Sequence, residues 1–92
     1  MMSATDEISY ERARQVHASV ERGEAWYAQI APEIEPQYHG YYIVIDVETG
    51  AYLLDKDDLR ALERGEQAFA GHWRHAKRVG YSGPVYGYPT GR

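Results

Sequence analysis

The chain has 92 residues, of which 43% are hydrophobic and 26% charged, with a formal net charge of −4 and no cysteine. This length allows one small domain, whose folding buries roughly 60–65% of the surface of the unfolded chain. The lack of cysteine excludes a disulfide scaffold, a thiolate zinc site and a thiol nucleophile. No apolar run approaches the ~20 residues of a membrane span, and the start of the chain lacks the core of a signal peptide. We therefore expect a cytoplasmic protein without a membrane partner.

The first predicted element is a long helix over residues 6–31, after a loose terminus at 1–5. Apolar and small residues recur there at the alternating spacing of three and four that one helix face requires. These residues are Ala13, Val16, Val20, Gly23, Tyr27, Ile30 and Ile34. Pro32 lacks an N–H and its ring clashes with the preceding turn, so we expect the helix to end near 31 and a connector to fill 32–40. Gly23 predicts either a bend or a close neighbour.

Two strands follow the connector. Residues 41–47 are rich in β-branched and aromatic side chains, which is typical of a strand. Residues 48–50 form a tight turn in which Gly50 supplies a positive φ, and residues 51–54 return as the second strand.

A second helix is expected to begin near Lys56, capped by Asp55, and to fade by Gly71. The remaining segments are a third strand, a turn, a short fourth strand and a tail, at residues 72–81, 82–84, 85–88 and 89–92. The order is therefore an N-terminal helix followed by β-β-α-β-(β). We predict one α+β domain over residues 1–92, in which a small antiparallel sheet, built within residues 41–88, has helices packed on it.

Residues 45–50, Ile-Asp-Val-Glu-Thr-Gly, resemble the first motif of the DnaQ-like exonucleases. In that motif two carboxylates on one strand face hold Mg²⁺, and Asp46 and Glu48 have this spacing. The chain departs from the family because no acidic residue follows Glu66. A metal-dependent nuclease is therefore the remote alternative. We interpret Asp46 and Glu48 as exposed residues that alternate with buried neighbours.

His72 and His75 form a second pattern that could suggest a metal. On a strand, an offset of three places them on opposite faces of the sheet. No cysteine, and no acidic residue nearby in the sequence, completes a set of ligands. We therefore expect no metal, no cofactor and no catalytic residue.

Charge divides the chain into an acidic and a basic part. All 14 acidic residues lie between Asp6 and Glu66, whereas residues 67–92 have only basic charges. Arg74, Lys77 and Arg78 lie among aromatic residues, and such a surface can stack bases and hold phosphates. The alternative, which we favour, is that the basic strand lies beside the acidic helix and is neutralised within the molecule.

Nine tyrosines and two tryptophans accompany a single phenylalanine. Tyrosine combines apolar area with a polar tip, which suits half-buried sheet faces and interfaces. The predicted interface combines the first helix with the aromatic C-terminal segment. Its candidate residues are Val16, Val20, Trp26, Tyr27, Trp73, Tyr81, Tyr86 and Tyr88.

A broader resemblance covers roughly residues 22–88. Its motifs are residues 23–27 (Gly-Glu-Ala-Trp-Tyr), Glu35-Pro36, residues 40–50 with Tyr52, residues 55–59, and residues 78–81 (Arg-Val-Gly-Tyr). These are similar to an uncharacterised family of small bacterial proteins that is frequent in cyanobacteria.

That resemblance implies a non-enzymatic accessory protein. Members of the family often lie beside a retropepsin-like aspartic protease in a two-gene unit, which implies an antitoxin-like or regulatory role. The chain departs from the family around residues 70–75. We therefore predict a protein-interaction module that binds a larger partner or itself, and a nucleic-acid-binding module is the alternative.

Overall fold

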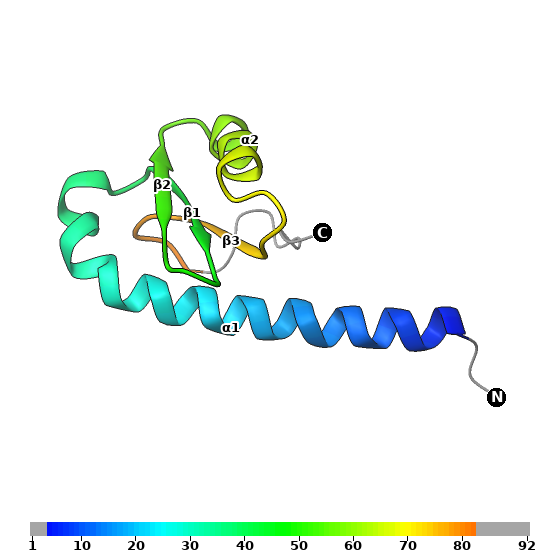
Figure 1. Ribbon diagram of the computed structural model, residues 1–92. Helices are drawn as coiled ribbons and strands as arrows, with labels where there is room; N and C mark the ends of the chain where they lie inside the picture. The colour runs from blue at the N-terminus through cyan, green and yellow to red at the C-terminus, as the bar shows by residue number, and fades with distance from the viewer. Residues whose placement is uncertain (1–3, 83–92) are drawn as a thin grey trace.

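The computed structural model describes the backbone of residues 4–82 and the side chains of residues 10–82. The element order is α1, β1, β2, α2, β3, with bounds Ala4–Tyr38, Tyr42–Asp46, Tyr52–Asp55, Asp58–Ala68 and Arg74–Arg78. Figure 1 shows the predicted α+β arrangement, in which both helices pack on a small antiparallel sheet. The predicted fourth strand, at residues 85–88, lies outside the described residues.

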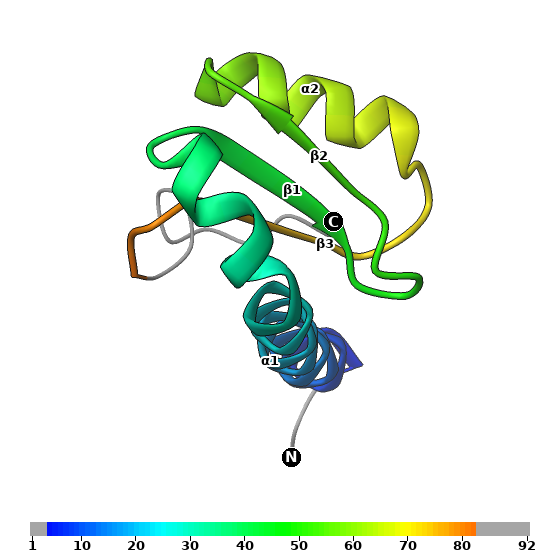
Figure 2. The same cartoon turned by 90° about the vertical axis from the view of Figure 1, so that its left-hand side faces the viewer.

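The sheet has the strand order β2-β1-β3, so β1 is its central strand. Val44 of β1 pairs with Leu53 of β2 on one side and with Ala76 of β3 on the other, and both pairings are antiparallel. Figure 2 shows that α1 and α2 cover opposite faces of this sheet. The chain therefore forms three layers, with β1 in the middle of the central layer.

Each face of the sheet has its own apolar core. Beneath α1 the buried residues are Tyr27, Ile34, Ile43, Ile45 and Val79. Beneath α2 they are Val44, Ala61 and Ala76, with Leu53 and Phe69 among the half-buried residues packed against them. Asp46 is only 3% exposed, so the prediction that Asp46 is an exposed strand residue is wrong.

Glycines allow both helices to approach the sheet closely. A Cβ on Gly23 of α1 would lie 2.3 Å from Cβ of His75 in β3. A Cβ on Gly65 of α2 would lie 2.5 Å from Val44 Cγ1 in β1. Of the two explanations expected for Gly23, the structure therefore shows the close neighbour.

Helix α1 continues through Pro32 and Pro36 to Tyr38, so the predicted end near residue 31 and the connector at 32–40 are wrong. Both prolines are exposed, whereas Ile34 between them is buried in the core. Water can therefore satisfy the carbonyls that lose an N–H partner, while packing of the opposite side holds the helix. Figure 1 shows that the last turns bend away from the axis of the rest of α1.

The residue that caps the second helix is Asp57, so the prediction of Asp55 as the cap is wrong. The Asp57 side chain accepts a hydrogen bond from the backbone N–H of Arg60, and the helix begins at Asp58. Asp55 ends β2 and accepts hydrogen bonds from Arg60 Nε (3.1 Å) and Arg64 NH1 (2.9 Å). Asp55 therefore joins β2 to the exposed side of α2.

The first half of α1 extends beyond the sheet, as Figure 1 shows. Every described side chain from Tyr10 to Ala18 is exposed, except that of Val16, which is half-buried. The molecule accordingly measures 53 × 23 × 23 Å along its principal axes. We call residues 10–18 of α1 the projecting segment.

Candidate interaction site

A polar cluster joins the middle of α1 to β3. His75 Nε2 lies 2.6 Å from Glu24 Oε2, and Lys77 Nζ lies 3.2 Å from Glu24 Oε1. His75 and Lys77 are buried, while the Glu24 side chain is 41% exposed. Because a carboxylate can only accept, His75 donates its Nε2 proton to Glu24. Burial alone would raise the pKa of Glu24, but the hydrogen bond from His75 and the charge of Lys77 together hold it below 4.5.

Tyr27 extends this cluster into the core. Lys77 Nζ lies 4.5 Å from the centre of its ring, and its hydroxyl donates to Glu35 Oε2 at 2.7 Å. The same hydroxyl accepts the backbone N–H of Gly80 at 3.0 Å. Burial and the hydrogen bond to Glu35 raise the pKa of Tyr27 above 10.0. These contacts fix the position of α1 on the sheet.

Two side chains of α1 hold the turn between β1 and β2. Trp26 Nε1 donates to the carbonyl of Val47 at 3.0 Å, and Arg22 donates to the same carbonyl at 3.3 Å. Gly50, in the turn, has φ +83° and a Cβ there would lie 2.7 Å from the Trp26 ring. The predicted positive φ of Gly50 is therefore confirmed, and the indole of Trp26 packs directly against it.

Asp46 and His72 form a partly buried pair beside this turn. The Asp46 carboxylate accepts from His72 Nδ1 at 2.7 Å and from the backbone N–H of Glu48 at 2.9 Å. Burial opposes ionisation of Asp46, but these hydrogen bonds lower its pKa below 3.8. The hydrogen bond to Asp46 raises the pKa of His72 above 6.5. Asp46 thus stabilises the turn after β1.

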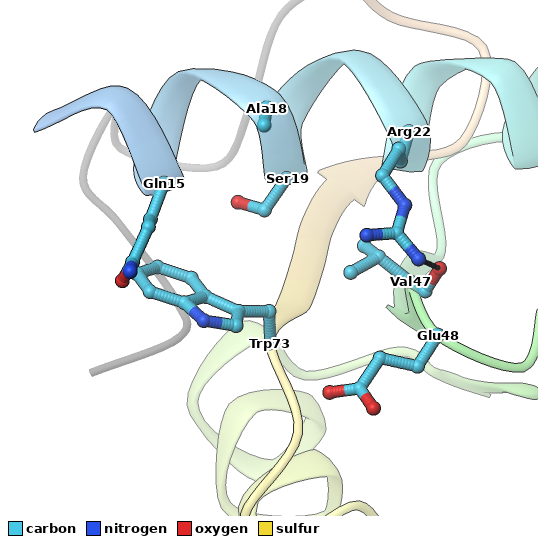
Figure 3. A pocket seen from close by; sticks show the side chains of 7 residues that line it. All are labelled: Gln15, Ala18, Ser19, Arg22, Val47, Glu48 and Trp73. Carbon is cyan, nitrogen blue, oxygen red and sulfur yellow. Dashed lines mark hydrogen bonds between the residues drawn. The ribbon is translucent and has the colours of Figure 1, made fainter. Parts of the chain in front are cut away.

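A groove lies between α1, the β1–β2 turn and Trp73 (Figure 3). Its volume is about 410 Å³, and its lining residues are Gln15, Ala18, Ser19, Arg22, Val47, Glu48 and Trp73. Arg12, from the projecting segment, places its guanidinium 5.4 Å from the centre of the Trp73 ring. Both charge signs therefore line or border one groove, with Arg12 and Arg22 from α1 and Glu48 from the turn.

The groove contains polar groups with unused hydrogen-bonding capacity. Among the described residues, the indole N–H of Trp73 and the amide of Gln15 take part in no hydrogen bond. Arg22 donates one hydrogen bond and retains further N–H groups. Figure 3 shows the Gln15 side chain directed toward the side of the groove on which Trp73 lies. This groove and the projecting segment together form the candidate interaction site.

The predicted interface residues occupy different environments. Tyr27 is a core residue, so its expected availability to a partner is wrong. Val16, Val20, Trp26 and Trp73 are half-buried, and Tyr81 is exposed. Val16 belongs to the projecting segment, and Trp73 lines the groove. The remaining two candidates, Tyr86 and Tyr88, lie outside the described residues.

The three basic residues of the predicted nucleic-acid surface are not brought together. Lys77 is only 4% exposed and pairs with Glu24 on the α1 side of the sheet. Arg74 and Arg78 have the opposite strand parity. Arg74 donates to the carbonyls of Phe69 and His72, and Arg78 lies over the rings of Tyr42 and Tyr81. The basic strand therefore meets the acidic helix through Lys77, as the internal alternative predicts.

Among the side chains of residues 10–82, no group of three or more His, Asp or Glu is arranged to hold a metal ion. Asp46 and Glu48, the pair named for the nuclease alternative, differ in environment because Asp46 is buried and Glu48 exposed. Neither helix of the described chain is both long and apolar enough to cross a membrane.

Sequence reasoning missed the α1 wall of the groove. Four residues of this wall lie outside or at the edge of the apolar stripe that predicts the core face of α1. They are Gln15, Ala18, Ser19 and Arg22. Their own spacing of three and four residues was a usable signal, because it marks a second face of the same helix. Glu24 was also missed, since its partners are about 50 positions away in the sequence.

Comparison of the chain with protein-family models, curated proteins and solved structures finds no match.

Proposed function

We propose that this chain is a non-enzymatic protein-interaction module that binds a protein partner through the projecting segment and the groove beside Trp73. The observation that carries the proposal is the extension of α1 beyond the sheet it covers. Short helices without tertiary packing are marginal in water, and most helix stability in proteins comes from burying one face. A partner that covers the projecting segment would supply that burial.

The side chains at this site are suited to an interface. Tyr10 is 67% exposed, Trp73 is half-buried, and Arg12, Arg14 and Arg22 lie on the same helix. Tyrosine, tryptophan and arginine are the residues most enriched at interface centres. An accessory or regulatory role is part of the proposal and is supported by the family resemblance of the sequence. A cytoplasmic location is also part of the proposal and follows from the expectation drawn from composition.

Site-specific photo-crosslinking in cells that produce the protein tests this function. A photoreactive amino acid would replace Tyr10 in the projecting segment, and in a control variant it would replace Glu63, which is exposed on α2. We expect a defined protein adduct from position 10, identified by mass spectrometry, and none from position 63. Equal labelling from both positions, or no adduct from position 10, would contradict the proposal.

A further inference from the structure

One face of α1 lies outside the core, and the hydrogen bond from Arg22 to the Val47 carbonyl joins it to the β1–β2 turn. The residues of this face are Glu11, Gln15, Ala18, Arg22, Ala25 and Gln29, and every one of them is exposed. They are spaced alternately by four and three residues, which is the period that lets two helices remain in contact along a seam. Three of them also line the groove beside Trp73. We call this set the outer stripe.

The outer stripe is complementary to itself when its direction is reversed. If two copies of α1 lie antiparallel with a twofold axis between residues 16 and 17, Glu11 faces Arg22 and Gln15 faces Ala18. Because the axis repeats each contact, two Glu–Arg pairs and two Gln–Ala contacts form together. The small side chain of Ala18 next to the axis permits a close approach of the two helices.

We propose that the occupant of the groove beside Trp73 is α1 of a second copy of this chain, lying antiparallel along the outer stripe. The inference rests on the proposed function and names the partner. Charge complementarity supports this occupant, since Arg22 on the groove wall meets Glu11 of the second copy. The projecting segment of each copy then lies beside the middle of α1 of the other copy. This segment extends beyond the sheet of its own copy, so the second copy would cover it.

Charge reversal gives the first test. Glu11→Arg and Arg22→Glu each replace two attractive contacts by two repulsive ones. Exposed ion pairs are individually weak, but the change acts at two contacts, so each variant should dimerise roughly tenfold more weakly. The variants mixed in equal amounts should form a heterodimer, because both of its contacts pair Arg with Glu. Glu21→Arg, which changes the charge equally on another face of α1, should leave the dimer unchanged.

The measurement is mass by light scattering over about 10 μM to 1 mM protein, a range suited to polar contacts of modest strength. Dimerisation of the wild type, its loss in both single variants and its return in the mixture support the proposal. A wild type that stays monomeric throughout, or a mixture no better than its components, overturns it. Crosslinking of Tyr10 to a different protein, with a monomeric wild type, would overturn the self-pairing and leave the proposed function standing.

Disulfide mapping gives a second test that also determines orientation, and the cysteine-free chain makes it unambiguous. In the proposed pair, the two copies of residue 18 are offset by about 4.5 Å along the helices, whereas those of residue 29 are about 37 Å apart. Ala18→Cys should therefore oxidise to a disulfide-linked dimer, and Gln29→Cys should not. Linkage of both variants would mean a parallel pair, and linkage of neither would exclude contact at this face; either result overturns the proposal.

Discussion

Gly23 shows how one residue sets the distance between a helix and a sheet. The position a Cβ would take there lies 2.3 Å from Cβ of His75, on a side chain that is itself fixed by Glu24. Glycine in a helix interior lowers helix stability by up to about 1 kcal/mol relative to alanine. The packing of α1 against β3, which the glycine permits, therefore has to contribute more stability than the helix loses at this position.

We expect Gly23→Ala to destabilise the protein by about 1–3 kcal/mol, because the added methyl group forces α1 away from β3. Denaturant unfolding followed by circular dichroism would measure this change. Gln29→Ala, on the exposed side of the same helix, should change stability by less than about 0.5 kcal/mol. An increase in stability from Gly23→Ala would show that the helix can shift without loss of its contacts.

At the level of elements, the sequence predicted most of the fold from local signals. The spacing of Val20, Tyr27 and Ile34 identified the core face of α1, and Gly50 located the β1–β2 turn. The sequence failed at Pro32, where local geometry favours an end to the helix but burial of Ile34 and Tyr38 beyond it favours continuation. Tertiary packing is not visible from local spacing, so this error could not have been avoided.

The predictions of the α2 cap and of an exposed Asp46 were wrong for a related reason. Asp55 and Asp57 are both acceptable caps in sequence, and only the path of β2 decides which of them precedes the helix. Asp46 would be exposed if nothing lay beside the end of β1, but its carboxylate pairs with His72 and with the turn that follows the strand. The candidate site was predicted only in part, through Val16 and Trp73, because its groove joins three segments, at residues 15–22, 47–48 and 73, that are far apart in the sequence.

Docking of α1 on β3 depends on a shared carboxylate. Glu24→Ala would leave His75 and Lys77 buried without an acceptor, which we expect to destabilise the protein by about 2 kcal/mol. Lys77→Met retains the apolar stem and the His75–Glu24 hydrogen bond, so its effect should be smaller. Thermal unfolding of both single variants and the double variant would measure the coupling. Equal effects of the two single variants would mean that Glu24 is not the shared acceptor.

At the scale of the whole molecule, three carboxylates link folding to pH. Hydrogen bonds from the Asp57 amide and from Arg64 and Arg60 lower the pKa of Asp55 to about 2, and the pKa values of Asp46 and Glu24 are also lowered. The unfolded chain therefore binds more protons than the folded one in acid. The resulting stabilisation is complete above the ordinary values of 3.8 and 4.5 and is lost as pH falls through the lowered values.

We accordingly expect the free energy of unfolding to decrease steadily from about pH 5 to pH 2. Denaturant titrations at several pH values would give the slope. Asp55→Asn should be less stable at pH 7 and should show a shallower slope, because one of the three linked groups is gone. A variant as steep as the wild type would mean that Asp55 titrates equally in the folded and unfolded chains.

The two tryptophans lie in separate parts of the molecule, so their intrinsic fluorescence can report on two different events. Trp26 packs against Gly50 and donates to Val47, so its fluorescence responds to the seating of α1 on the turn. Trp73 borders the groove beneath Arg12, so its emission responds to whatever enters there. Replacing one tryptophan by phenylalanine would leave the other as the single tryptophan, whose fluorescence then reports on its own site alone. Folding of the domain and filling of the groove can thus be followed separately, in the same chain and without an attached dye.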